Sequence, residues 1–466
     1  MDYADHVLSG RRAQSTPVSL TTGTGYSVFK SLVIPSIANA RKEVILATCF
    51  WAPSATRDGV RDALVALSNR ALETSCRITV RICFSSSSLA RNMLWPTPKD
   101  GQNYSPTQWA KLLGLSGPAD VRGLDLAVTR KFFWPFGIIH SKYVIVDRKL
   151  AIFPSCNVSW ERWFEVAVAI KGPVVQDLIV FHKSFWRPPP PSPTGRSTLV
   201  PIGECERREG EGDDEEEDHG DSDDDENVGA QLNPGSSTAS STLNLDPSPT
   251  VLLPSPHKTS LLPFWCRPRA LVGQCPCMTI PSSSASEYSQ TPLLCTTHHL
   301  LSTARSSITM LTPNLTEPTV LDAIREALRR GVGVRVWTNR NLMTAEQMVT
   351  AGTTTPACVR NLRRTSRGVR GQLDVRFFDD HVQRDTAATT STSTTKTTPG
   401  VIPPGGRETT PVKLHAKVTI VDDDKILLGS GNMDAASWRT SQELGVLIES
   451  RAVIERFKKE WKHGGL

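Results

Sequence analysis

Two stretches of the chain carry a histidine, a lysine and an aspartate at one spacing, H-x-K-x-x-x-x-D. The residues are His140, Lys142 and Asp147 in the first stretch, and His415, Lys417 and Asp422 in the second. An imidazole titrates near neutral pH, so it can act as a base, a nucleophile or an acid. A lysine can neutralise phosphate oxygens while negative charge builds on them. Two histidines and two lysines around one point therefore predict a site that cleaves phosphodiesters.

The residues after each motif match as well. Each histidine is followed by a serine, by an asparagine seventeen positions on, and by a glutamate that begins another apolar run. These residues are Ser155, Asn157 and Glu165 in the first copy, and Ser430, Asn432 and Glu443 in the second. The copies differ where Pro154 stands in place of Gly429, and Glu165 lies three residues closer to its histidine than Glu443 does. A lone His–Lys pair is typical of a solvated strand edge, but recurrence of the whole pattern favours a site.

A strand, a helix and a second strand are predicted before each motif. The first set covers residues 40–51, 56–72 and 76–84, and the second covers residues 304–315, 316–332 and 333–338. In the second helix Thr316 is the N-cap candidate and Gly331 the C-cap candidate. This order implies βαβ units, and hence a parallel or mixed sheet in each half. Since residues two apart in a strand share a face, we expect each histidine and its lysine to point the same way from within a strand.

Composition separates the two repeats. Residues 1–21 are polar and lack periodicity, and residues 188–289 are rich in proline, serine, threonine and acidic residues. Both segments are expected to be disordered, because they hold too little apolar surface to bury a core. We predict a first folded domain over residues 22–187 and a second over residues 290–466, with a disordered insertion over residues 386–411.

Charge is unevenly distributed along the chain. The stretch from Glu204 to Glu226 holds fifteen acidic residues and two arginines, a net charge of −13. The whole chain has a net charge of +6, so the remainder carries +19. Such a basic remainder suits an anionic partner, namely phospholipid head groups, a membrane surface or nucleic acid. Charge alone does not separate these partners from a merely soluble basic surface.

Several features bear on the location of the protein. No run of about 18 apolar residues predicts a transmembrane helix. The first twenty residues lack the basic-then-apolar pattern of a secretory signal. Ten cysteines are scattered without a regular framework, so we expect reduced thiols. These features predict a cytoplasmic protein, with peripheral contact to membranes as an open alternative.

The paired motifs resemble the two HKD motifs of the phospholipase D superfamily, each with its G-S-x-N extension. The resemblance covers both repeats, about two thirds of the chain. It implies an α/β fold of two tandem phospholipase D-like domains, each a mixed β-sheet flanked by helices, related by a pseudo-twofold axis. It also implies a reaction through a phosphohistidine intermediate, which requires neither a metal nor another cofactor.

The resemblance also implies a role for each site residue. His140 is assigned as the nucleophile and His415 as the general acid, with the order of the two left open. The phosphate would be bound by Lys142, Lys417, Asn157 and Asn432. These ligands would be supported by hydrogen bonds from Ser155 and Ser430. The histidines would be oriented by Glu165 and Glu443. Asp147 and Asp422 complete the catalytic motifs, but they fall on the other parity of a straight strand, which favours a structural role.

The most favoured function is that of a phospholipase D-like phosphodiesterase or phosphatidyltransferase acting on phospholipids. A nuclease of the same superfamily, a cardiolipin synthase-like transferase and a non-catalytic binding module are the alternatives. Two motifs in one chain favour lipid chemistry, whereas the basic charge keeps nucleic acid open. We expect a monomer.

Overall fold

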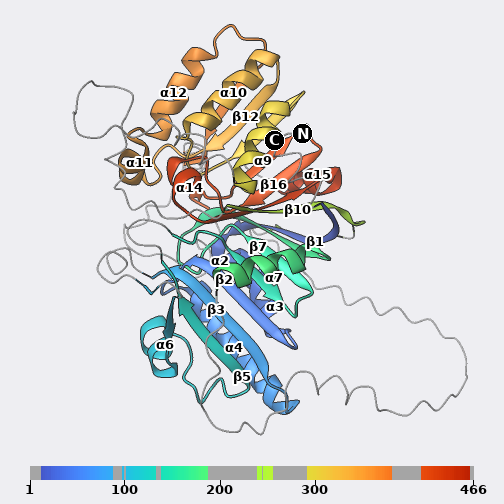
Figure 1. The fold of residues 1–466 in the computed structure, drawn as a ribbon, viewed down its shortest axis with the longest axis vertical. Helices are drawn as coiled ribbons and strands as arrows, with labels where there is room; N and C mark the ends of the chain where they lie inside the picture. The colour runs from blue at the N-terminus through green and yellow to red at the C-terminus, as the bar shows by residue number, and fades with distance from the viewer. Residues whose placement is uncertain are drawn as a thin grey trace, which may run out of the picture.

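The computed structural model describes residues 12–87, 97–98, 101–132, 138–186, 239–243, 245–255, 291–379 and 411–461. These residues form two β-sheets that face each other, with helices on the outer sides (Figure 1). This architecture confirms the predicted α/β class with a mixed sheet in each half. Most of the expected linker and nearly all of the insertion over residues 386–411 lie outside the described residues. The pseudo-twofold axis and the exact domain bounds stay predictions.

The first sheet runs in the order β4-β5-β3-β2-β6-β7-β8-β1. Its strands are β1 (Ala13–Thr24), β2 (Glu43–Phe50), β3 (Ile78–Ser86), β4 (Gln102–Tyr104), β5 (Leu124–Arg130), β6 (Tyr143–Val146), β7 (Leu150–Pro154) and β8 (Trp163–Lys171). Strands β5, β3 and β2 are parallel, and the other neighbours in this order are antiparallel. A short strand, β9 (Ala239–Thr242), also pairs with β1.

The second sheet repeats this order as β13-β12-β11-β15-β16-β17-β10. Its strands are β10 (Ser248–Ser255), β11 (Ser307–Leu311), β12 (Gly333–Thr338), β13 (Leu373–Phe377), β15 (Val418–Val421), β16 (Lys425–Gly429) and β17 (Glu443–Ile448). The two-residue β14 (Lys413–Leu414) pairs instead with β8 of the first sheet. Strand β1 joins the sheets, because its first residues pair with β10 and the rest with β8.

Helices cover the outer faces of both sheets and close the ends of the layer between them. The first half holds α2 (Gly25–Val28), the π-helix η1 (Phe29–Val33), α3 (Ile34–Ala38), α4 (Ala55–Glu73), α6 (Pro106–Leu113) and α7 (Val174–Phe185). The second half holds α9 (Pro292–Thr303), α10 (Pro318–Arg330), α11 (Thr344–Ala351), α12 (Thr355–Thr365), α14 (Ala435–Arg439) and α15 (Arg451–Glu460). The N-cap of α10 is Glu317 rather than the expected Thr316, and the helix ends at Gly331 with φ of +98° as predicted.

Two strands lie in segments that the sequence predicted to be disordered. Strand β1 begins at Ala13, inside the predicted N-terminal disorder, and β10 lies inside the predicted linker. In β1 four of the seven buried residues are serine or threonine, so apolar periodicity gives no signal there. In β10 two prolines flank a run of only four buried residues, and prolines argue against a strand. The ladders to β8 and β17 satisfy the backbone of both strands and override these local preferences.

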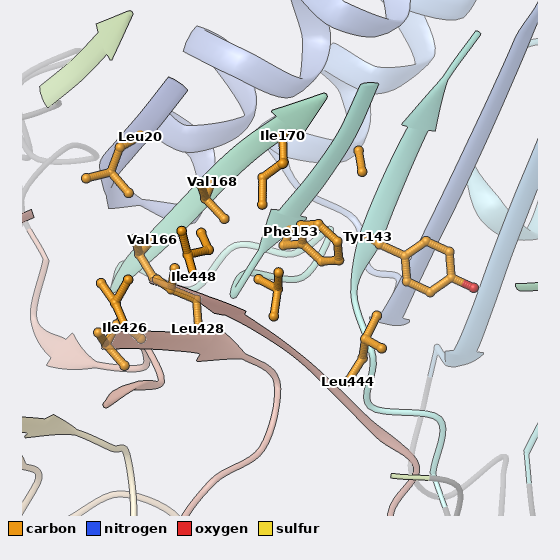
Figure 2. Close-up of a cluster of buried hydrophobic side chains, with 14 of the residues drawn as sticks. Leu20, Tyr143, Phe153, Val166, Val168, Ile170, Ile426, Leu428, Leu444 and Ile448 are labelled. Atoms are coloured by element: carbon orange, nitrogen blue, oxygen red, sulfur yellow. The ribbon is translucent and has the colours of Figure 1, made fainter. Parts of the chain in front are cut away.

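The largest core cluster lies between the two sheets. Figure 2 shows Phe153, Val168 and Ile170 of the first sheet close to Leu428 and Ile448 of the second. Each fully buried aliphatic side chain contributes about 1.5–3 kcal/mol of hydrophobic stabilisation. Because both faces of the first sheet are covered, its central strand β6 is fully buried and apolar at every position.

The structure bears on two expectations about location, the lack of a membrane-spanning helix and the reduced state of the cysteines. Among the described helices, none is long and apolar enough to cross a bilayer. Cys49, Cys83 and Cys156 are buried free thiols, but Cys76 is disulfide-bonded. The expectation of reduced thiols throughout the chain is therefore wrong at Cys76.

The aspartates of the two motifs form the turns that follow β6 and β15. Asp147 and Asp422 both adopt φ of +53°, in the left-handed region. The Asp147 carboxylate accepts hydrogen bonds from the backbone N–H groups of residues 41, 42 and 43, at 2.7–3.0 Å. The Asp422 carboxylate accepts the equivalent bonds from residues 305, 306 and 307. Each aspartate thus fixes its turn against the start of β2 or β11.

These bonds affect the titration of Asp422. Burial alone would raise its pKa, but the hydrogen bonds from Ser307, Ser306 and Arg305 outweigh burial and hold the pKa below its ordinary value. The stabilisation is therefore present above the unfolded pKa of about 3.9 and is lost as the pH falls through the folded pKa.

We expect substitution of Asp147 to affect stability rather than chemistry. Asp147→Ala should lower the free energy of unfolding by about 2–3 kcal/mol, because the turn loses its cap and alanine is strained at positive φ. Asp147→Asn should cost only about 1 kcal/mol, because asparagine tolerates this conformation and keeps an acceptor. Urea denaturation of both variants measures the difference. Lost turnover at unchanged stability would instead place this carboxylate in the chemistry.

Candidate active site

The two histidine-bearing segments each pair with a strand of the opposite half. The backbone N–H of His140 donates to the carbonyl of Gln442, at 2.8 Å, just before β17. The N–H groups of His415 and Ala416 donate to the carbonyl of Phe164 in β8, at 2.9 and 2.8 Å. His140 and Lys142 lie before the start of β6, and His415 and Lys417 lie before the start of β15. The expectation that they lie within a strand is therefore wrong. The segments leave their own sheets because they bond across the interface.

Each histidine is oriented by the glutamate of the other copy. Nδ1 of His140 lies 2.9 Å from Oε2 of Glu443, and Nδ1 of His415 lies 2.7 Å from Oε1 of Glu165. A carboxylate at Nδ1 favours the tautomer that carries its proton there. This tautomer leaves the lone pair of Nε2 available for attack or proton transfer.

The two serines hold these glutamates. The hydroxyl of Ser155 donates to Oε2 of Glu165 and accepts from the N–H of Val166, at 2.9 Å. The hydroxyl of Ser430 donates to Oε2 of Glu443, and accepts from the N–H of Leu444 at 3.0 Å. Both serine hydroxyls therefore bond the glutamates, whereas they were expected to support the lysines and asparagines that bind the phosphate.

Both motif lysines are buried beside their histidines. Nζ of Lys142 donates to the carbonyl of His140 at 2.8 Å, and Nζ of Lys417 donates to the carbonyl of His415 at 2.6 Å. Nζ of Lys417 also lies 2.9 Å from Nε2 of His415. Two ammonium groups inside the protein attract an anion far more strongly than they would in water.

The two asparagines are bonded differently. Oδ1 of Asn157 accepts from the N–H of Phe50 at 3.2 Å. Nδ2 of Asn432 donates to Asp434 at 3.0 Å, while its buried Oδ1 has no hydrogen-bond partner in the described part of the chain. The predicted site residues that the structure does not bring to this place are Asp147 and Asp422. Each lies seven positions after its histidine, a distance of about 20 Å along an extended chain.

Burial shifts the pKa values of the site unequally. Burial lowers the pKa of His140 and, with Lys417 nearby, that of His415 further still. Burial would raise the pKa of Glu443, but the charge and hydrogen bond of His140 outweigh it and lower the pKa. Burial raises the pKa of Glu165 to about 7 and lowers that of Lys417 to about 7. Glu443 is therefore ionised at neutral pH, whereas Glu165 and Lys417 titrate there.

Trp163 is the first residue of β8. Its ring lies against the imidazole of His415, with centroids 4.7 Å apart. The counterpart two residues before the other glutamate is Ser441, so this position supplies an aromatic ring to His415 but not to His140. Gln442 was not predicted at all, yet it is fully buried and accepts from the hydroxyl of Ser141 at 2.6 Å.

A pocket adjoins the site on the side of the second half. It is bordered by Lys417, Asn432 and Glu443, and otherwise lined largely by apolar side chains, among them Leu293, Leu428 and Trp438. Among the described residues, no three histidine, cysteine or acidic side chains converge as metal ligands would.

Comparison with known proteins identifies a related domain and a related fold. Residues 298–463 match the family described as "Cardiolipin synthase, PLD-like domain". The chain is 13% identical to phosphatidylserine synthase from Haemophilus influenzae Rd KW20, covering 99% of this chain and 89% of that one, with a TM-score of 0.50. It is 17% identical to Nuc, a phospholipase D family member from Salmonella typhimurium, covering 38% and 90%, with a TM-score of 0.24. No curated protein sequence matches the chain.

The fold follows from the first of these structures alone, since the superposition on Nuc is too poor to carry weight. The family match covers the second histidine motif, and the structural match extends the same fold over nearly the whole chain. The first half repeats the strand order of the second and brings its own histidine to the same place. Residues 298–463 therefore form a phospholipase D-like domain, and the chain as a whole shares the fold of phosphatidylserine synthase.

Proposed function

We propose that this protein is a phospholipase D-type phosphodiesterase or phosphatidyltransferase that acts on phospholipids. The observation that carries the proposal is the pair of crossed contacts, His140 to Glu443 and His415 to Glu165. They bring two oriented imidazoles and two buried lysines to one place. This set supplies a nucleophile, a proton donor and two cations for a phosphate group.

The proposed reaction has two steps. Nε2 of His140 attacks phosphorus and the bond from phosphorus to the leaving oxygen breaks. His415, protonated once the anionic substrate lies beside it, gives that oxygen its proton. His140 then carries the phosphatidyl group as a phosphohistidine. In the second step His415 takes a proton from water or an alcohol, whose oxygen attacks phosphorus and releases His140. Lys142, Lys417, Asn157 and Asn432 bind the phosphate oxygens throughout.

Three differences between the histidines support His140 as the nucleophile. Its side chain is 12% exposed, against 6% for His415. Within the described part of the chain its Nε2 has no hydrogen-bond partner, whereas Nε2 of His415 contacts Lys417. The ionised Glu443 at its Nδ1 would also stabilise the positive charge of a phosphorylated imidazole.

The matched family supports the substrate class. Its description names cardiolipin synthase, and the structure with the same fold is a phosphatidylserine synthase. Both names describe transfer of a phosphatidyl group, so we infer a lipid substrate, with transfer to an alcohol as well as to water. The basic excess of +19 outside the acidic block is equally suited to nucleic acid, which the experiment below therefore includes.

The substrate assay compares lipid and nucleic acid directly. Purified protein is incubated with labelled phospholipid vesicles, with and without a primary alcohol, and in parallel with single- and double-stranded DNA. We expect free head group from the lipid and a new phosphatidyl ester when the alcohol is present. Cleavage of DNA with no lipid turnover would sink the lipid proposal and favour the nuclease.

The roles of the histidines can be separated with an activated substrate. Both His140→Asn and His415→Asn should abolish phospholipid turnover without unfolding the protein. On bis(p-nitrophenyl) phosphate the leaving group needs no proton, so His415→Asn should release one equivalent of nitrophenolate per enzyme and then stall. His140→Asn should give no burst. The reverse pattern would assign His415 as the nucleophile, and turnover retained by either variant would refute the paired mechanism.

The titration of Lys417 predicts the alkaline limit of activity. Its pKa is lowered by burial to about 7, so kcat/KM should fall as the pH rises through about 7 and the cation is lost. The nearby Glu165 raises this pKa, so Glu165→Gln should move the fall to lower pH. Glu43→Gln, which removes a carboxylate that pairs with Arg148 rather than with a site residue, serves as the control. A pH–rate profile that is unchanged or shifted upward in Glu165→Gln would contradict this assignment.

A further inference from the structure

We propose that Ser85 and Asn339 are positioning residues, one in each half, that hold the backbone just before each reactive histidine. Neither residue belongs to the histidine motifs or to their downstream extensions. The inference rests on the proposed function, in which Nε2 of each imidazole must reach the phosphate group. It concerns how the two imidazoles are aimed, whatever molecule carries the phosphate.

Ser85 lies near the end of β3 and is fully buried. Its hydroxyl accepts a hydrogen bond from the N–H of Ile139 at 3.0 Å and donates to the carbonyl of Lys131 at 3.0 Å. Ile139 immediately precedes His140. One hydroxyl therefore ties the histidine-bearing segment to the chain that leaves β5.

Asn339 directly follows β12 and is 1% exposed. Its Oδ1 accepts from the N–H of Leu414 at 2.8 Å, and its Nδ2 donates to the carbonyl of Leu414 at 2.8 Å. Nδ2 also donates to the carbonyl of Pro313 at 3.1 Å. Leu414 immediately precedes His415, so the amide holds both polar groups of the residue before this histidine.

The two residues occupy equivalent positions in the two sheets. In the first sheet Cys83 of β3 pairs with Ala47 of β2, and Ser85 lies two residues after Cys83. In the second sheet Trp337 of β12 pairs with Leu311 of β11, and Asn339 lies two residues after Trp337. Their side chains differ, yet both bond the N–H that precedes a histidine. A shared bond from unlike side chains argues that the bond, rather than the packing volume, is required.

Each histidine backbone is consequently held from two sides. The residue before it bonds to its own half through Ser85 or Asn339, and its own N–H bonds to the opposite half at Gln442 or Phe164. Together with the glutamate at Nδ1, these bonds fix the origin and the direction of the imidazole. Loss of a positioning bond should lower kcat about 10–100-fold, because misplacing a reactive group by about 1 Å has an effect of this size. KM should stay unchanged, since the phosphate ligands are untouched.

The test compares each variant with a neighbouring control. Ser85→Ala is matched by Ser86→Ala, which removes a hydroxyl that is 2% exposed and has no hydrogen-bond partner in the described chain. Asn339→Ala is matched by Thr338→Val, which removes a buried hydroxyl that bonds the same Pro313 carbonyl but not Leu414. Steady-state kinetics on bis(p-nitrophenyl) phosphate and thermal unfolding are measured for all four.

We expect kcat to fall in Ser85→Ala and Asn339→Ala but not in the controls, at similar Tm and KM. Ser85→Thr, which keeps the hydroxyl, should recover most of the lost kcat. Equal kcat in a variant and its control would overturn the inference, as would a loss of kcat that merely follows Tm and is not recovered by threonine.

A second measurement needs no turnover. Vanadate adopts a five-coordinate geometry only with a well-placed nucleophile, so the variants should bind it about 10-fold or more weakly while binding inorganic phosphate normally. Unchanged vanadate affinity would count against positioning. Wild-type protein that cleaves the activated diester but no phospholipid would refute the lipid substrate alone, and so the two failures are distinguishable.

Discussion

The reactive centre depends on a pair of contacts that neither half of the chain can make by itself. Glu443 orients the histidine of the first half, and Glu165 orients that of the second. The packing of one sheet against the other therefore determines where both imidazoles lie. The apolar layer in Figure 2 has a role beyond stability, because a shift between the sheets would change both contacts together.

The halves repeat their strand order but differ in the residues around their histidines. Among the described residues, an aromatic ring contacts His415 but not His140, and a buried glutamine bonds the segment of His140 but not that of His415. Glu443 keeps its charge at neutral pH, whereas Glu165 titrates there. In the proposed reaction the two imidazoles never do the same task at the same time. Two histidines with different roles in one reaction need different surroundings, even when the fold around them is repeated.

Local pattern predicted much of the frame, and motif spacing predicted most of the site. The strands and helices between residues 43 and 86 and between residues 307 and 338 follow from apolar runs with a clear period. Strands β1 and β10 carry no such signal, because pairing with distant strands rather than their own composition orders them. The position of the histidines outside their strands depends on bonds across the interface, which no local period encodes. Ser85 and Asn339 were missed for the same reason, since their partners lie 54 and 75 positions away.

Strand β1 has a consequence for the order in which the molecule can assemble. Among the described strands it is synthesised first, yet its neighbour β8 follows about 150 residues later and β10 later still. Closing such long loops is entropically slow, so β1 emerges from the ribosome well before either ladder exists. During synthesis its backbone donors and acceptors are without their final partners. Strand β1 is thus synthesised early but is among the last strands to gain its hydrogen-bond partners. Its pairing with β8 and β10 then joins the two sheets.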